Sequence, residues 1–187
     1  MNRIHRWLCR SEGWKNSLQN SIVPWVLSDI DLGSDVLEVG PGPGLTTDLL
    51  RTRHERLTAI EIDDQLVAAL QERLAGTNVE VVRGDATSMP FEDSSFSGAV
   101  AFTMLHHVPS TEKQDQLLRE VRRVLRPGAV FAGTDAKRSV PLRLLHIGDT
   151  YVPIDPNQFG SRLRAAGFTD IRIAENDRRF RFQAHRA

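Results

Sequence analysis

Short apolar runs alternate along most of the chain with segments whose apolar residues recur at helical spacing. The runs are four to seven residues long, which predicts buried strands rather than helices. They lie at residues 36–39, 57–62, 79–82, 96–102 and 129–134. Helices are expected between them, at residues 45–50, 66–74 and 111–125. This order of strands and helices predicts a parallel sheet that is covered by helices on both faces.

The C-terminal part of the chain departs from this alternation. After a helix expected near residues 156–166, residues 168–174 and 180–184 both alternate between apolar and polar side chains, and only residues 175–179 separate them. A parallel crossover needs about a dozen residues or more, so these two strands should pair as an antiparallel hairpin. The predicted fold class is therefore α/β, with a Rossmann-like doubly wound sheet that is mostly parallel and whose last strand is antiparallel.

The helix over residues 111–125 carries the sharpest boundary signals of the chain. Thr111 and Gln114 have the spacing of a capping box, which predicts the helix start. The apolar residues that follow are Leu117, Leu118, Val121, Val124 and Leu125. Pro127 and Gly128 come directly after them and are expected to end the helix.

The length of 187 residues and the lack of a linker-like segment predict one domain over residues 1–187. Residues 1–31 should form an N-terminal helical cover, and residues 32–187 should form the core. Apolar residues recur at approximately helical spacing over residues 16–31, where Pro24 is expected to kink or divide the helix.

Charge and cysteine content exclude several classes of protein. The chain has 24 basic and 24 acidic residues, so no global field attracts nucleic acid or an anionic membrane. Cys9 is the only cysteine, which leaves no internal disulfide and no Cys/His metal pattern, so no metal site is expected. The N-terminus lacks the continuous apolar stretch of a signal peptide, and no run approaches the ~20 apolar residues of a membrane helix. We expect a cytoplasmic protein.

A glycine-rich loop joins the first predicted strand to the following helix. Its sequence is Gly40-Pro41-Gly42-Pro43-Gly44. Ligands bind beyond the carboxyl ends of strands in doubly wound sheets, and glycines let the backbone approach a ligand closely. A dinucleotide fingerprint would need a glycine where Leu45 stands, and no Gly-Lys-Ser/Thr follows as in a P-loop. The loop alone therefore indicates only an anion near a helix N-terminus.

Two carboxylates follow the next two strands. Glu61 lies at the end of the second strand, 21 residues after Gly40, where a carboxylate can accept both hydroxyl protons of a ribose. Asp63 is a rival for that role but more plausibly caps the next helix. Asp85 follows the third strand in Gly84-Asp85-Ala86, where a carboxylate can accept from the exocyclic amine of an adenine; a turn aspartate is the alternative. Their joint placement with the loop indicates an adenosine site.

These motifs resemble those of class I S-adenosylmethionine-dependent methyltransferases. The segments that carry the resemblance are Val36 to Gly44, Ala59-Ile60-Glu61-Ile62-Asp63 and Gly84-Asp85-Ala86. Leu105-His106-His107-Val108 and Val124 to Ala129 are similar to the methyltransferase type 11 branch, which acts on small molecules. The resemblance runs from about Leu32 to the C-terminus and implies a seven-stranded sheet whose last strand is reversed, in agreement with the predicted hairpin.

The resemblance also implies S-adenosyl-L-methionine as cofactor and a role for each matching residue. The loop residues Gly40, Pro41, Gly42 and Gly44 would hold the methionine portion, and Glu38 would help orient its amino group. Glu61 would bind the ribose, Asp85 and the Ala86 backbone would bind the adenine, and Ile62 would pack on the adenine ring. Phe102 would end the strand beneath the sulfonium.

The segment from Phe102 to His107 lies where the acceptor and the methyl group should meet. Two histidines there suggest a general base, because histidine titrates near neutrality. We expect His106 to face the acceptor as the catalytic residue and His107 to hold the loop through a backbone hydrogen bond. A structural role is the more common one for such residues.

The acceptor itself is not named by the sequence. We expect a small molecule bound between the N-terminal segment and residues 136–155, with a second copy of the chain as a candidate for closing the site. Side chains that could touch substrate there are Trp7, Trp14, Trp25, His146, Asp149 and Tyr151. Ribosomal RNA adenine dimethylases share the loop, but they carry Asn-Leu-Pro-Tyr-like residues where this chain has Phe102-Thr103-Met104-Leu105. A non-catalytic nucleotide-binding module or partner subunit is the other alternative.

Overall fold

The computed structural model describes residues 11–187 and contains one seven-stranded sheet with the strand order β3-β2-β1-β4-β5-β7-β6. The strands are β1 (Asp35–Val39), β2 (Arg56–Glu61), β3 (Val79–Arg83), β4 (Phe96–Phe102), β5 (Leu125–Ala136), β6 (Phe168–Glu175) and β7 (Arg179–Arg186). Strands β1 to β5 pair in parallel, and β7 pairs antiparallel with both β5 and β6. The predicted fold class and the C-terminal hairpin are confirmed.

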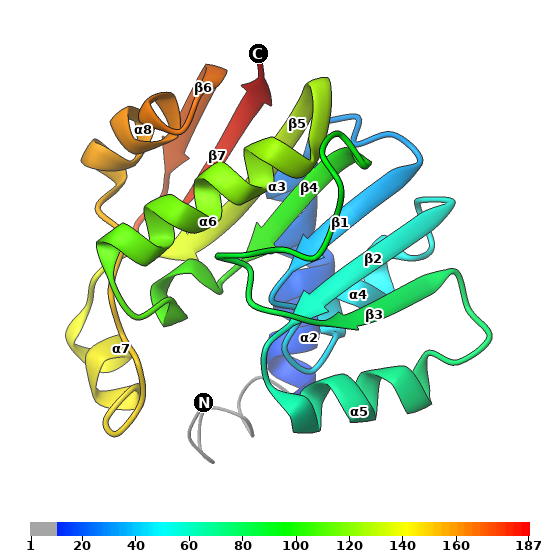
Figure 1. The fold of residues 1–187 in the computed structure, drawn as a ribbon. Helices are drawn as coiled ribbons and strands as arrows, with labels where there is room; N and C mark the ends of the chain where they lie inside the picture. The colour runs from blue at the N-terminus through cyan, green and yellow to red at the C-terminus, as the bar shows by residue number, and fades with distance from the viewer. Residues whose placement is uncertain (1–10) are drawn as a thin grey trace.

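Alternate side chains of the central strands pack against helices on opposite faces of the sheet. On one face, Leu37 and Ala99 share a core with α6 (Thr111–Val124) and α8 (Pro156–Ala165), which lie across the sheet in Figure 1. On the other face, Val36 and Val100 pack with the N-terminal helices and α4 (Leu45–Leu50). Helix α5 (Asp64–Arg73) packs on β2 and β3 and begins at the cap Asp63, as predicted. Both faces of the sheet are therefore covered.

The N-terminal cover is a helical segment that changes its geometry in the middle. It consists of α2 (Glu12–Ser17), a π-helical turn (Leu18–Ile22) and α3 (Val23–Leu27). Pro24 lies in the first turn of α3, where the backbone N–H that a proline lacks is not needed for a helical hydrogen bond. The π-helical turn lies just before Pro24 and divides the segment into two α-helices, as expected. The chain still continues along the sheet.

Helix α6 begins where predicted and ends one residue earlier, but its capping residue differs from the prediction. The helix is capped by Ser110, whose extended backbone lets its hydroxyl accept the Lys113 N–H at 3.2 Å. Gln114 does not take part in a capping box with Thr111, because its amide is buried and donates to backbone carbonyls elsewhere. The helix also ends at Val124, and Pro127 lies inside β5, where the register with β4 shifts between Phe96 and Gly98.

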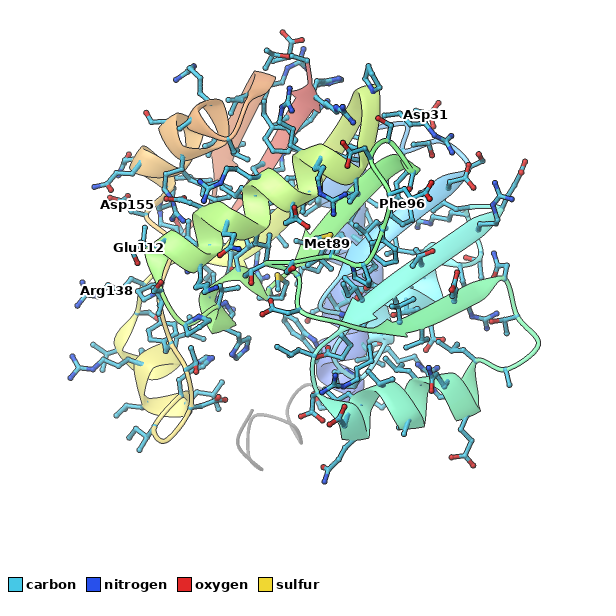
Figure 2. The ribbon with its side chains drawn as sticks, in the orientation of Figure 1. Asp31, Met89, Phe96, Glu112, Arg138 and Asp155 are labelled. Atoms are coloured by element: carbon cyan, nitrogen blue, oxygen red, sulfur yellow. The ribbon has the colours of Figure 1, made fainter. Side chains whose placement is uncertain are left out.

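The segment between β5 and α8 contains the short helix α7 (Val140–Leu145), which stands at the end of the sheet toward which the β1 and β4 arrows point (Figure 1). Figure 2 shows Arg138 at the start of this segment, far from Met89, which lies in the core beneath α6. Among residues 11–187, no helix is both long and apolar enough to cross a membrane.

Candidate functional site

A cavity of about 770 Å³ lies at the carboxyl ends of the parallel strands. Its walls come from the ends of β1, β2, β3 and β4, from α2, and from the segment that contains α7. Predicted site residues that line it are Gly40, Pro41, Gly42, Glu61, Ile62, Asp85, Ala86, Phe102 and His106. Its volume is within the range of small-molecule and cofactor sites, and its position is the one expected for a doubly wound sheet.

The glycine-rich loop needs the conformational freedom of glycine at the cavity. Gly40 and Gly42 have φ values of +65° and +56°, a region that favours glycine. A Cβ on Gly40 would lie about 3.0 Å from the Met104 side chain, whereas nothing lies within 4 Å of the corresponding position on Gly42. Gly44 does not line the cavity; it caps α4 and packs against Leu70 and Arg73 of α5. Gly44 therefore supports the loop on the side that faces α5.

Glu38 lies behind the cavity wall rather than in it. Its side chain is fully buried, and its two carboxylate oxygens accept hydrogen bonds from the hydroxyls of Thr46 and Thr47 in the first turns of α4. Burial raises the pKa of Glu38 to about 7, against the opposing effect of the two threonine hydroxyls. Thr46 lines the cavity, so any influence of Glu38 on a ligand passes through the start of α4.

Glu61 connects the second strand to the glycine-rich loop. One carboxylate oxygen accepts the backbone N–H groups of Ile62 and Asp63 at 2.8 and 3.1 Å, and the other accepts the Gly42 N–H at 3.1 Å. These bonds fix the orientation of the carboxylate at the cavity wall. Carboxylate oxygens have about four lone-pair sites in total, so acceptor capacity remains for a pair of hydroxyl groups.

The ends of the second and third strands supply one apolar and one polar group to the same end of the cavity. Asp85 is exposed, and one of its oxygens accepts the Thr87 N–H at 2.8 Å, which holds the carboxylate in a turn. The side chain of Ile62 is 63 % exposed, although large apolar residues in this fold are mostly buried. An exposed isoleucine that lines a cavity beside Asp85 and Ala86 offers a flat apolar surface to a planar ring.

The chain turns sharply after β4, between Phe102 and His106. Phe102 is nearly buried at the cavity floor, and Thr103 has a φ of +54°, which is uncommon for a β-branched residue. The Thr103 N–H donates to the Thr134 carbonyl at 2.8 Å, which anchors this turn to β5. The turn directs the next residues, a short 3-10 helix at Leu105–His107, into the cavity wall.

His106 is held by Asp135 near the carboxyl end of β5. The imidazole Nδ1 lies 2.6 Å from one oxygen of Asp135, and the other oxygen accepts the His106 backbone N–H at 3.2 Å. Burial alone would raise the pKa of Asp135, but the charge of His106 and the hydrogen bonds to His106 and Ala136 outweigh it, so the pKa lies below its usual value. Within residues 11–187, the His106 Nε2 has no hydrogen-bond partner. An oriented imidazole with its outer nitrogen unused suits proton transfer.

His107 and His146 surround His106 and form the group of side chains best suited to a metal ion. Potential ligand atoms of the three histidines lie within 4.8 Å of one another. A tetrahedral zinc ion with Zn–N bonds of about 2.0–2.1 Å would bring such nitrogens to about 3.4 Å, so the rings would have to move together. His146 is fixed through Nδ1 by the Leu142 carbonyl at 2.7 Å, and burial lowers its pKa. No spacing pattern in the sequence signals this cluster.

Sequence reasoning missed three residues that the structure brings to the site. Asp135 could have been found, because it is an acidic residue near the end of a buried strand, as Glu61 is. Gln114 holds the 3-10 helix by donating to the Leu105 carbonyl at 3.1 Å and the Val152 carbonyl at 2.9 Å. Arg179 lines the cavity from β7, and only the reversed direction of that strand puts it there.

Of the expected acceptor-side residues, Trp14 and Asp149 line the cavity, while His146 and Tyr151 stack on each other with their ring centroids 4.7 Å apart. Trp25 packs in the N-terminal cover. Trp7 and Cys9 lie outside the described residues.

The central part of the chain matches a known protein family. Residues 37–133 match the family model described as a methyltransferase domain. A protein of Mycolicibacterium smegmatis named "Probable S-adenosylmethionine-dependent methyltransferase" is 32% identical over 140 residues, which are 74% of this chain and 50% of that protein. The chain thus spans about half the length of this relative.

Another relative is named for ribosomal RNA, and a solved structure shares the fold. Ribosomal RNA small subunit methyltransferase A of Moorella thermoacetica is 46% identical over 66 residues, 35% of this chain and 23% of that protein. Among solved structures, the PH0226 protein from Pyrococcus horikoshii has a TM-score of 0.82 at 17% identity, covering 96% of this chain and 94% of that one. At this identity the likeness supports the fold alone.

Proposed function

The chain belongs to the methyltransferase domain family, and on that premise we propose that it transfers the methyl group of S-adenosylmethionine to a small-molecule acceptor. One observation carries the proposal: His106, oriented by Asp135, lines the same cavity as the glycine-rich loop, Glu61 and Asp85. A group able to take a proton therefore shares one enclosed space with the groups expected to bind the cofactor.

The cofactor lies along the carboxyl ends of β1, β2 and β3. The loop of Gly40, Pro41 and Gly42 faces its methionine portion, and Glu38 acts on that portion through Thr46. The Glu61 carboxylate would accept the ribose hydroxyls, and Asp85 and the Ala86 backbone would bind the adenine. Ile62 would pack on the adenine ring, and Phe102 would end the strand near the sulfonium. The exposed side chain of Ile62 and the remaining acceptor capacity of Glu61 support these roles.

The sulfonium of the cofactor supplies an activated methyl group, so the protein needs to orient the acceptor and receive a proton. The acceptor's nucleophile, a hydroxyl, thiol or amine group, would attack the methyl carbon. His106 would accept the proton of that group at Nε2. The carbon–sulfur electron pair leaves with S-adenosylhomocysteine. Asp135 keeps Nδ1 protonated and stabilises the imidazolium that forms, as a carboxylate does in hydrolytic triads.

A small acceptor is favoured over RNA. The walls beyond the cofactor residues come from α2, α7 and Arg179, and they bound a cavity of about 770 Å³, a size that suits a small molecule together with the cofactor. The chain carries no net charge to attract a phosphate backbone. The cytoplasmic location and the homodimer expected from the sequence remain predictions for this chain.

Calorimetry with S-adenosylmethionine and S-adenosylhomocysteine tests the proposal, followed by S-adenosylhomocysteine release with a panel of acceptors. We expect both ligands to bind and some hydroxyl, thiol or amine acceptor to support turnover that His106→Ala abolishes. Folded protein that binds neither ligand would contradict the methyltransferase proposal. Binding without transfer to any acceptor would favour a non-catalytic module, and transfer only to ribosomal RNA would favour the nucleic-acid alternative.

A further inference from the structure

Two arginines of β7 occupy equivalent positions but have different surroundings. Arg179 and Arg181 are two residues apart on the same strand, so their side chains project from the same face of the sheet. Each guanidinium lies over a tryptophan of the N-terminal cover, Arg179 at 5.5 Å from the Trp14 ring centroid and Arg181 at 5.4 Å from that of Trp25. The pair therefore offers an internal comparison.

Arg181 has the hydrogen bonds of a structural arginine, and Arg179 does not. Arg181 donates to the Trp25 carbonyl and, at 2.9 Å, to the Ser28 hydroxyl. In Arg179 the Nη1 is buried without a hydrogen-bond partner in the described part of the chain. Residues 1–10 contain no aspartate or glutamate that could pair with it. An arginine remains charged in a protein, so this group carries an uncompensated desolvation cost.

Asp135 is the acidic residue whose charge acts on Arg179, but its hydrogen bonds go to His106. Burial lowers the pKa of Arg179, and the charge of Asp135 partly opposes that change. Asp135 directs both of its oxygens at His106, with one also accepting the Ala136 N–H at 2.6 Å. No ion pair joins Asp135 to Arg179 within the described residues, so the guanidinium remains able to bind an external anion.

Arg179 lines the cavity where β5 and β7 meet. It is the first residue of the reversed strand β7 and pairs with Ala136, the last residue of β5, and both line the cavity. Strands β4 and β5 separate β7 from β1, the strand that leads into the glycine-rich loop. At about 4.8 Å per strand, β7 lies roughly 14 Å from β1. The cofactor carboxylate beside that loop is therefore the less suitable partner.

We propose that Arg179 binds a carboxylate of the methyl acceptor, so that the substrate is a carboxylic acid with an apolar body. This rests on the proposed function, because it names the class of acceptor for the same cavity. The guanidinium forms a planar fork that matches a carboxylate with two parallel hydrogen bonds. The carboxylate serves as a handle, and the nucleophile that His106 deprotonates is a different group of the same molecule.

The surroundings favour a carboxylate over a phosphate and an apolar body over a polar one. One guanidinium compensates the single charge of a carboxylate, whereas a phosphate carries close to two. Arg179 lies over Trp14, and the cavity walls also include Leu142 and Leu145. A purely polar anion would leave these apolar side chains facing water.

The test uses benzoate as the probe on protein saturated with S-adenosylhomocysteine, with benzamide as its neutral counterpart. We expect calorimetry to detect benzoate and no comparable binding of benzamide. Arg179→Met should lower benzoate affinity at least tenfold, since two charge-assisted hydrogen bonds are lost. Arg179→Lys should weaken it less, because the charge remains. The matched control Arg181→Met should keep benzoate affinity while lowering the melting temperature, since Arg181 has structural hydrogen bonds.

Several results would overturn the proposal. These are no benzoate binding to the wild-type protein, equal binding of benzoate and benzamide, and benzoate binding that Arg179→Met leaves unchanged. Inorganic phosphate that binds through Arg179 more tightly than benzoate would contradict the choice of a carboxylate. A weakened S-adenosylhomocysteine affinity in Arg179→Met with intact benzoate binding would assign Arg179 to the cofactor. Because S-adenosylhomocysteine binding is measured first, failure of the proposed function is seen separately.

Discussion

The imidazole of His106 lies 2.6 Å from the carboxylate of Asp135, although the two residues are 29 positions apart in the chain. Asp135 stands near the end of β5, and His106 lies in the 3-10 helix that follows β4, the neighbouring strand. Both side chains are almost completely buried. The contact fixes the tautomer of the ring, because the carboxylate requires a proton on Nδ1, and it leaves the Nε2 lone pair without a partner among the described residues.

Replacing Asp135 tests that relationship without removing the histidine. Asp135→Asn should lower turnover by about 100-fold or more, because an amide supports the wrong tautomer and cannot stabilise the imidazolium. The affinity for S-adenosylhomocysteine should stay unchanged, since Asp135 is not a cofactor ligand. Nitrogen-15 spectra of the histidine ring should show the proton on Nδ1 in the wild-type protein. Wild-type turnover in a folded Asp135→Asn protein would remove the pair from the mechanism.

Replacing Glu61 tests the cofactor site. Glu61→Ala should weaken S-adenosylhomocysteine binding by about 100-fold, because it removes the proposed acceptor of the ribose hydroxyls and also frees the Gly42 N–H from the bond that holds the loop. Calorimetry measures the change. Asp64→Ala is the matched control, since Asp64 is an exposed acid of the same segment that pairs with Arg83. Equal losses in the two variants would speak against a direct contact of Glu61 with the ligand.

The sequence predicts those parts of the site that follow from local order. The glycine-rich loop follows β1, Glu61 is the last residue of β2 and Asp85 comes two residues after β3, and the carboxyl ends of parallel strands meet at one edge of a sheet. Their convergence therefore needs only the correct element order. The same logic extends to Asp135, which comes one residue before the end of β5.

Other parts of the site depend on packing that no local pattern contains. Gln114 has the spacing of a capping residue, yet its amide is used to hold the 3-10 helix and Val152. Glu38 is a predicted ligand of the cofactor amino group, yet its oxygens are taken by Thr46 and Thr47. Arg179 lies in an alternating strand, where only the register with β5 brings it to the cavity. Side-chain direction and register decide these three cases.

Gln114 should act as a positioning residue for His106. Gln114→Leu leaves two buried carbonyls, those of Leu105 and Val152, without the donor that joins them. We expect a loss of about 2 kcal/mol in the free energy of unfolding and a fall in kcat with little change in cofactor affinity. Gln114→Glu keeps the shape but loses the donor when ionised, so at neutral pH its kcat should fall as in Gln114→Leu. A loss of stability with unchanged kcat would show a purely structural role.

Glu38 should make both stability and cofactor binding depend on pH. Burial raises its pKa from 4.5 to about 7, so between these values the folded chain binds a proton that the unfolded chain has lost. The free energy of unfolding therefore falls as the pH rises from 4.5 to 7, by about 3 kcal/mol at roughly 1.4 kcal/mol per pK unit. Urea unfolding at pH 5 and pH 8 should show this fall relative to Glu38→Gln, which keeps the shape but does not titrate.

The same carboxyl should release its proton when the cofactor binds. The cofactor brings a sulfonium and an ammonium group toward the loop, and nearby positive charge favours the ionised form of Glu38. S-adenosylmethionine affinity should therefore rise with pH from about 6 to 8, and calorimetry at pH 6.5 in two buffers of different ionisation enthalpy should show proton release. Glu38→Gln should abolish both effects. Proton release of equal size in Glu38→Gln would place the linked group elsewhere in the cavity.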